Sequence, residues 1–153
     1  MKSEEMSGTI GIKDHVSDKE TESDKFYKEF EPKLNDRFVV YMEDVPVYLI
    51  NKVMRPIVSV EDDKYIYSDL ILELYDPITP SATQIFTEFE RKGKTTFDKI
   101  ILSILGPIGD EVEKWVYKNC KIKTVEHSKL DWANSHPISL TVTLSFEEAI
   151  HEF

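Results

Sequence analysis

Hydrophobic and polar residues alternate along the last third of the chain. In Ser139-Leu-Thr-Val-Thr-Leu-Ser-Phe146 every second residue is apolar, which is the pattern of a β-strand with one buried face and one hydroxyl-rich, solvated face. Further apolar runs cover residues 100–105, 112–117 and 121–125, and turn residues such as the glycine-rich segment 106–110 separate them. This region therefore predicts four strands of an antiparallel sheet.

Three more strands are predicted nearer the N-terminus. Segments 38–42 and 46–53 flank the polar pair Glu43-Asp44 and predict a β-hairpin. Arg55-Pro56 ends its second strand, because proline cannot donate to a ladder. The next strand lies within 65–75, is centred on 70–75, and ends at Asp76-Pro77.

One helix is predicted after that strand. Ser81-Ala-Thr-Gln84 has the capping-box spacing, with a serine at the N-cap and glutamine three residues later. Ile85, Phe86 and Phe89 then share one helical face, and Gly93 follows two cations at the expected C-terminus. The expected fold is mainly β: an antiparallel β-barrel or sandwich of about seven strands, closed or nearly closed, with one α-helix plugging an end.

Residues 1–31 differ in composition from the predicted β domain at 32–153. They contain nine acidic and five basic residues and few large apolar ones before Phe26. Such a segment buries too little surface to offset its ordering entropy. We therefore expect an acidic, mobile arm, with Phe26 and Phe30 as candidate anchors on a neighbouring chain. A short helix over 24–30 is an open alternative.

The chain carries a net charge of −10, from 29 acidic and 19 basic residues. This sign argues against a conventional nucleic-acid reader, whose affinity comes from neutralising phosphates. It is compatible with a wall past which nucleic acid slides, and equally with a simple contribution to solubility. The apolar runs are too short to cross a bilayer, and Met1–Met6 contains no apolar signal core, so neither membrane association nor export by that route is expected.

Motifs for catalysis or metal binding are not evident. Cys120 is the single cysteine and predicts a reduced strand residue. His127 and His136 flank Asp131, but their spacing matches no familiar zinc pattern. The acidic run Glu61–Asp63 lacks a glycine-punctuated calcium loop and predicts a solvated turn. No nucleophile elbow or phosphate loop occurs, and we expect no enzyme activity, no cofactor and no metal.

Several blocks, taken in order, resemble the tail tube proteins of contractile-tailed bacteriophages, part of a superfamily that includes type VI secretion tubes. The first block, Arg37–Pro56, looks like the opening hairpin of that family, which often ends in Arg-Pro. The strand and helix start at Leu70–Pro77 and Ser81–Gln84 follow, and Glu113–Ile122 resembles the strand pair after the turn. Leu130-Asp-Trp132 and Ile138–Phe146 are similar to the closing strand. The resemblance covers about residues 36–147.

This resemblance implies a structural virion protein, assembled in the host cytoplasm, whose hexameric rings stack into a hollow tail tube for genome ejection. Its partners would be copies of itself, the tail sheath protein and the baseplate or initiator proteins. The tape-measure protein and double-stranded DNA would occupy the lumen without sequence-specific binding.

Two sets of residues become candidates under this interpretation. The candidate lumen lining is the hydroxyl face of the last strand, although the same face on the outer surface is a rival assignment: Ser139, Thr141, Thr143 and Ser145. The candidate ring-stacking contact is the tip of the loop 59–67: Glu61, Asp62 and Asp63. Exposed sheet edges would pair between neighbours in the ring, and a non-closing axial contact would let rings stack.

Other interpretations remain open at this stage. Only 13 residues, 57–69, separate Pro56 from Leu70, and many relatives have a longer excursion there that reaches the adjacent ring. A baseplate initiator or terminator ring protein is thus an alternative, as is the tube subunit of a secretion or injection system. From other classes, the alternatives are a small ligand-binding β-barrel with Trp115 and Tyr117 in its pocket, and a divergent enzyme.

Overall fold

A computed structural model describes residues 31–153 of the chain, and Leu34–Phe153 form one compact unit. The predicted arm and its candidate anchors Phe26 and Phe30 lie outside the described residues.

The described residues contain nine strands, one α-helix and one short 3-10 helix. The helices are α3 (Ala82–Lys92) and η1 (Val47–Leu49). The strands are β1 (Phe38–Tyr41), β2 (Ile50–Met54), β3 (Val58–Glu61), β4 (Lys64–Tyr67), β5 (Leu70–Tyr75), β6 (Thr96–Leu105), β7 (Glu111–His127), β8 (Ser139–Ser145) and β9 (Glu148–His151). The prediction of a mainly β, antiparallel fold with one α-helix is confirmed.

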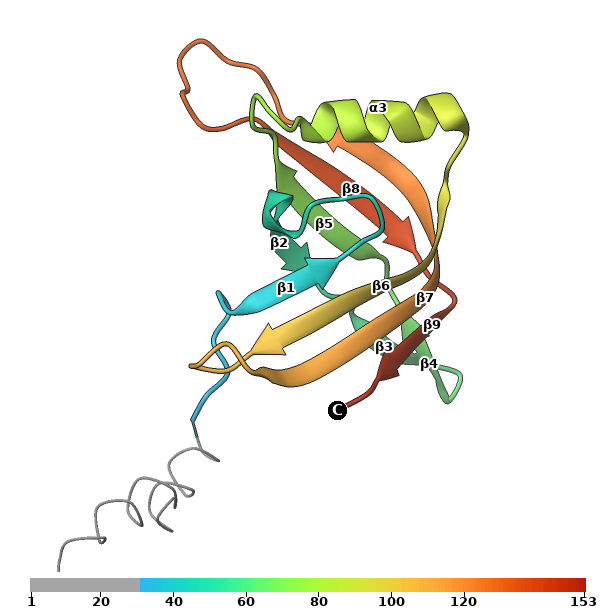
Figure 1. Ribbon diagram of the computed structural model, residues 1–153. Helices are drawn as coiled ribbons and strands as arrows, with labels where there is room; N and C mark the ends of the chain where they lie inside the picture. Colours follow the sequence, from blue (N-terminus) through green and yellow to red (C-terminus); the bar gives the residue numbers. More distant parts are fainter. Residues whose placement is uncertain (1–30) are drawn as a thin grey trace, which may run out of the picture. The chain divides into compact units, whose positions relative to one another are not determined.

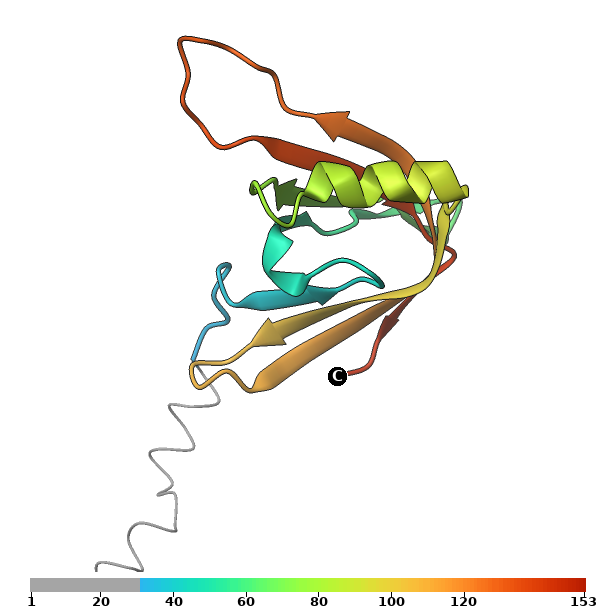
Figure 2. The same ribbon diagram turned by 45° about the horizontal axis from the view of Figure 1, so that its top comes forward.

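Seven of the strands form one sheet in the order β1-β6-β7-β8-β5-β2, and β9 pairs with the N-terminal part of β7. The sheet curls around a single core, and α3 lies across one end of it (Figures 1 and 2). The strands at the two ends of this order, β1 and β2, are not paired with each other. The barrel is therefore nearly closed and has two free edges.

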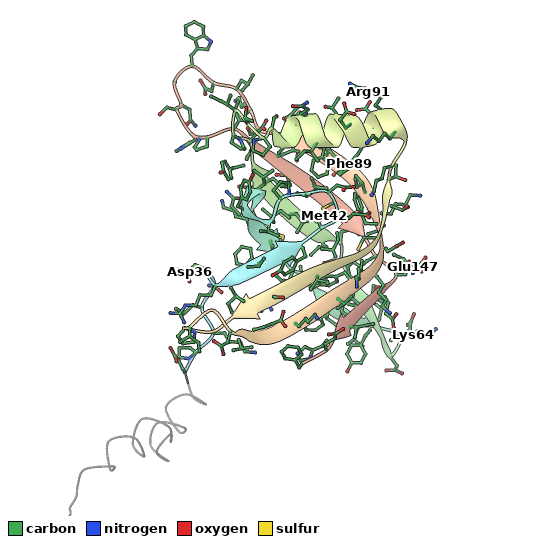
Figure 3. All side chains as sticks on the ribbon, viewed as in Figure 1. Asp36, Met42, Lys64, Phe89, Arg91 and Glu147 are labelled. Carbon is green, nitrogen blue, oxygen red and sulfur yellow. The ribbon has the colours of Figure 1, made fainter. Side chains whose placement is uncertain are left out.

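The core follows directly from the alternation in the sequence. In β5 and β8 every second residue is buried, and these inward residues face one another across the strand pair: Leu70, Leu72, Leu74, Leu140, Val142 and Leu144. Phe86 and Phe89 of α3 also point into this core, and the Phe89 ring meets Phe97 of β6 edge-on at 5.4 Å. Figure 3 shows Phe89 on the barrel side of α3 and Arg91 on the opposite side.

Helix α3 begins and ends where the sequence predicts. The Ser81 side chain accepts a hydrogen bond from the Gln84 amide, and Gly93 has the left-handed conformation at φ 71°. An additional cap comes from Asp76, whose Oδ1 accepts hydrogen bonds from the Ala82 amide at 2.8 Å and the Ser81 hydroxyl at 2.9 Å. The residue that ends β5 thus also fixes the start of the helix that closes the barrel.

The predicted hairpin of segments 38–42 and 46–53 is wrong. A turn does occur at Asp44, where φ is 65° and the Val45 amide bonds to the Met42 carbonyl. After it the chain enters η1 instead of a returning strand, so β1 pairs with β6 and β2 pairs with β5. In this arrangement Val40, Leu49 and Ile50 are buried in the core, which favours pairing with the distant strands.

Other boundaries also differ from the prediction. The strands expected at 112–117 and 121–125 form one strand of 17 residues, β7, because its pairing with β6 continues past Asn119 to Lys121, where β8 begins to pair. Asn119, at φ 53°, does not reverse the chain. The strand expected within 65–75 is divided into β4 and β5, and β3 and β9 were not predicted. Short strands of this kind are defined by the partner they pair with more than by their own residues.

Candidate functional site

A two-stranded hairpin projects from the large sheet. Strands β3 and β4 pair in register from Val58–Tyr67 to Glu61–Lys64 and form a sheet of their own. Asp62 and Asp63 make the two-residue turn, with φ values of 50° and 61°. Positive φ at both central positions is the type I′ geometry that suits the right-handed twist of a hairpin.

One face of this hairpin is apolar and exposed to solvent. The cross-strand pairs Val58–Tyr67 and Val60–Tyr65 put four apolar side chains on the same face, and Val60 is 61% exposed and Tyr65 75% exposed. A two-stranded hairpin has little stability alone in water, and a contiguous exposed apolar patch marks an interaction surface. We name Val58, Val60, Tyr65 and Tyr67 the hairpin surface.

The sequence prediction located the tip of this structure. Glu61, Asp62 and Asp63 lie at the tip, as expected for a loop over 59–67. Strand β3 and the apolar face were missed, whereas most of β4 fell within the strand expected at 65–75. The available signal was the alternation Val58-Ser-Val60 and the strand-forming run Tyr65-Ile-Tyr67, on either side of two residues that tolerate positive φ.

The base of the hairpin is attached to the barrel through aromatic rings. Tyr67 contacts Phe146 at 6.0 Å between ring centroids, and Phe146 contacts Tyr117 of β7 at 5.1 Å. Burial raises the pKa of the Tyr117 hydroxyl to about 12, with nearby Arg55 opposing part of that shift. At the root, Ile57 and Ser68 exchange hydrogen bonds, including the Ile57 amide to Ser68 Oγ at 2.6 Å. The hairpin is therefore held at its base and free at its tip.

Trp115 and Tyr117, the residues considered for a ligand pocket, fill the same end of the barrel. Tyr117 belongs to the core. The Trp115 ring stacks on His151 of β9 at 4.6 Å, and its indole N–H donates to Glu113. Glu113 in turn pairs with Arg55 at 3.7 Å. These contacts give both rings a packing role.

The hydroxyl residues of β8 lie on the outward face of the sheet. Ser139, Thr141, Thr143 and Ser145 are half-buried there, opposite the buried Leu140, Val142 and Leu144. The neighbouring strands add further polar groups, because Thr141 lies between Glu73 of β5 and Glu126 of β7 in the register. Lys52 of β2 pairs with Glu73 at 3.6 Å. The structure therefore gives this candidate face a polar surface that includes carboxylates.

Four exposed apolar side chains lie on two connections that meet near the start of α3. Ile78, between β5 and α3, is 98% exposed, and Leu130 and Trp132 are exposed in the connection between β7 and β8. The two connections touch, since the Asp76 amide bonds to the Ile138 carbonyl at 2.9 Å. We name Ile78, Leu130, Trp132 and Ile138 the loop surface.

The polar residues of that connection serve its own turns. The Asp131 carboxylate accepts from the Ala133 amide at 3.0 Å, and the Asn134 side chain accepts from the His136 amide at 2.9 Å. Among residues 31–153, no three His, Cys, Asp or Glu side chains are placed to hold a metal ion together. Over the same residues, no helix has the length and apolar character needed to span a membrane.

Comparisons with known proteins identify the fold. No protein-family model and no curated protein matches the sequence. Among solved structures, the sheath–tube complex of the PVC extracellular contractile injection system matches with a TM-score of 0.59 at 16% identity, covering 88% of this chain and 99% of that one. The tube-terminating cap of the anti-feeding prophage matches with a TM-score of 0.59 at 14% identity, over 79% and 91%. Hcp1 from Flavobacterium johnsoniae matches with a TM-score of 0.56 at 10% identity, over 76% and 94%.

The chain therefore has the tail-tube-like fold that its sequence resemblance predicted. At these identities the likeness concerns the fold.

Proposed function

We propose that this protein is a structural subunit that forms rings, and that these rings stack into the tube of a contractile apparatus. A phage tail is the first candidate because of the sequence resemblance, and an injection system is the second. The observation that carries the proposal is the hairpin surface: an apolar face on an otherwise unpartnered hairpin, set on a tail-tube-like barrel. An exposed apolar face of this kind is typical of a surface that binds a neighbouring chain.

Ring formation would use the free edges of the sheet. Strands β1 and β2 each present an unpaired edge, and such edges are a risk for uncontrolled pairing unless a defined neighbour covers them. Six copies in a closed ring, the number that the resemblance implies, would cover them with one another. The sheath and the baseplate proteins would then be partners of the assembled tube.

The hydroxyl face of β8 is our proposed lumen lining. A polar wall with carboxylates does not bind phosphate, so DNA and a tape-measure protein would pass without being trapped. Replacing Thr141 and Thr143 with lysine should preserve the fold, because both side chains lie on the outward face and Glu73 and Glu126 flank Thr141 in the register, and should slow genome ejection. The matched control is Thr87→Lys on the exposed face of α3. Normal ejection from particles that contain both lysines would place this face on the outside.

The hairpin is our proposed axial contact between rings, with Glu61, Asp62 and Asp63 at its tip. Lysine at 62 and 63 would reverse the charge but also strain the turn, because both positions need positive φ. A cleaner test is Asp62→Asn with Asp63→Gly, since Asn-Gly favours the type I′ turn and removes two negative charges. This variant should form rings normally and change only the salt dependence of stacking. If this variant stacks like the wild type at every salt concentration, the tip is not part of the axial contact.

Electron microscopy of the purified full chain tests the proposal as a whole. We expect sixfold rings in projection, and stacked tubes when an initiating ring from the baseplate is supplied. The protein should stay soluble at low salt, where the acidic hairpin tips repel one another. A protein that remains monomeric under all these conditions would refute the structural role.

A baseplate or terminator ring is a second candidate function. The tube-terminating cap matches this chain with the same TM-score as the sheath–tube complex, 0.59, and the segment 57–69 is short. Copy number in purified particles separates the two candidates. A tube subunit should increase in copy number with tail length, whereas an initiator or terminator should be present as a fixed number of rings.

A further inference from the structure

The two exposed apolar surfaces lie at opposite ends of the same barrel strand. The loop surface ends at Ile138, immediately before β8, and Phe146, immediately after β8, contacts Tyr67 of the hairpin surface. A strand of seven residues spans roughly 23 Å. Figures 1 and 2 both show the connection 128–138 and the β3–β4 hairpin at opposite ends of the β domain. A single copy cannot cover one surface with the other.

The charges of the two ends are compatible with a contact between them. Residues 61–64 at the hairpin tip carry three acidic side chains and one lysine, a net charge of −2. Residues 127–138 carry one lysine and one aspartate together with His127 and His136, so this segment has no net negative charge in a chain whose total is −10. An acidic tip approaching this segment therefore meets no net like charge within it.

We propose that the hairpin surface of one copy docks onto the loop surface of a second copy in the next ring. The inference rests on the proposed function and names the partner of the hairpin. Trp132 would lie over the Val60–Tyr65 pair, because a large exposed indole and an exposed apolar ladder are the two largest unpartnered groups on these faces. Lys129 would face the acidic tip.

This arrangement accounts for unlimited stacking. The two surfaces are different, so the contact is heterologous and does not close on itself, and each new ring presents the same free surface as the last. Six such contacts would form at once between two stacked rings, so the stack is stable even when each single contact is weak. Because each contact is weak, the apolar surfaces do not have to be large, and a free subunit that exposes them stays soluble.

Cysteine cross-linking tests the pairing directly. Val60→Cys and Ala133→Cys are made separately in the full chain, mixed, assembled, and treated with a short bis-maleimide; Ala133 is exposed beside Trp132, so the indole is kept. Cys120 is fully buried and stays unreactive in the folded protein. We expect a covalent dimer only in the mixture, and a ladder of covalent multimers from the variant that carries both changes. Thr87→Cys on α3 replaces Ala133→Cys as the matched control and should give no dimer with Val60→Cys.

A second measurement uses the affinity of stacking. Trp132→Ala removes a side chain that is fully exposed and should not alter the fold of the subunit. Loss of a central aromatic group weakens one contact by about tenfold or more. Because the loss is repeated at all six contacts of a junction, we expect the protein concentration needed for stacking to rise well beyond tenfold, with ring formation unchanged. Ile108→Ala is the matched control, since Ile108 is 82% exposed but lies outside both surfaces.

The outcomes separate this inference from the proposed function. Tubes that form with Trp132→Ala at the wild-type concentration, or a Val60→Cys that cross-links to another position in assembled tubes, would overturn the pairing and leave the tube role intact. A wild-type protein that never forms rings would overturn both.

Discussion

The Asp76 carboxylate should be one of the most important polar groups for the stability of the barrel. Its Oδ1 caps the start of α3 through the Ala82 amide and the Ser81 hydroxyl, and its Oδ2 accepts from the Thr83 hydroxyl at 2.6 Å. Burial raises the pKa of Asp76, but the hydrogen bonds from Thr83, Ser81 and Ala82 outweigh it, so the pKa lies below the usual value. The ionised form is therefore the one that the fold stabilises.

Asp76→Ala removes all of these bonds at once. A lost helix cap costs about 1 kcal/mol, and a hydrogen bond to a charged group about 1.5–3 kcal/mol, so we expect a loss of about 2–3 kcal/mol in the free energy of unfolding. Asp76→Asn keeps one acceptor oxygen and should cost roughly half as much. The effect extends beyond the first turn, because α3 carries Phe86 and Phe89 into the core.

Urea and thermal unfolding followed by circular dichroism measure the change. A loss of this size corresponds to a decrease in Tm of roughly 6–12 °C for a domain of this length. Asp98→Asn, at an exposed carboxylate of β6, is the matched control and should leave Tm unchanged.

The dependence on pH has a definite sign. Because the pKa of Asp76 is lower in the folded state, its contribution is fully present above its unfolded pKa of about 3.9 and is lost as the pH falls through the folded pKa. The difference between wild type and Asp76→Ala should therefore shrink in acid. An Asp76→Ala variant as stable as Asp98→Asn, or a difference that does not change in acid, would refute capping by the ionised carboxylate.

Three further predictions concern the barrel. Gly106→Ala should cost about 1 kcal/mol in urea unfolding, because a Cβ there would lie 2.5 Å from Asp110 Oδ1, a side-chain end that is able to turn away, and 3.1 Å from Val112; a loss well above this value would show that the turn cannot relax. Burial raises the pKa of the Cys120 thiol to about 11, so an alkylating reagent should modify Cys120 far more slowly in the folded protein than in the unfolded chain. Equal rates would show that Cys120 is not buried in the core. Lys94 donates to Glu43 Oε1 at 2.6 Å, and Lys94→Met should speed amide exchange over residues 42–45; unchanged exchange would show that this ion pair does not hold the turn.

The sequence alone determined the features that depend on local geometry. The alternation over 139–146 correctly assigned the inward and outward residues of β8, because successive side chains of a strand point to opposite faces. The capping box at Ser81 and the glycine at 93 correctly placed both ends of α3, because helix termini are completed by residues within one turn. The order of the matching blocks was sufficient to predict the tail-tube-like fold.

Only the tertiary structure decided which strands pair and which apolar groups stay outside. The segments around Glu43 have a hairpin pattern, yet β1 and β2 pair with β6 and β5, because burial against distant strands outweighs a local turn preference. The sequence did not show that the hairpin surface is exposed, because Val58 and Val60 have the pattern of core residues. Only the topology shows that β3 and β4 form a sheet separate from the large one. The loop surface was likewise invisible, because burial is a property of the whole packed chain, whereas a sequence pattern records only which residues are able to be buried.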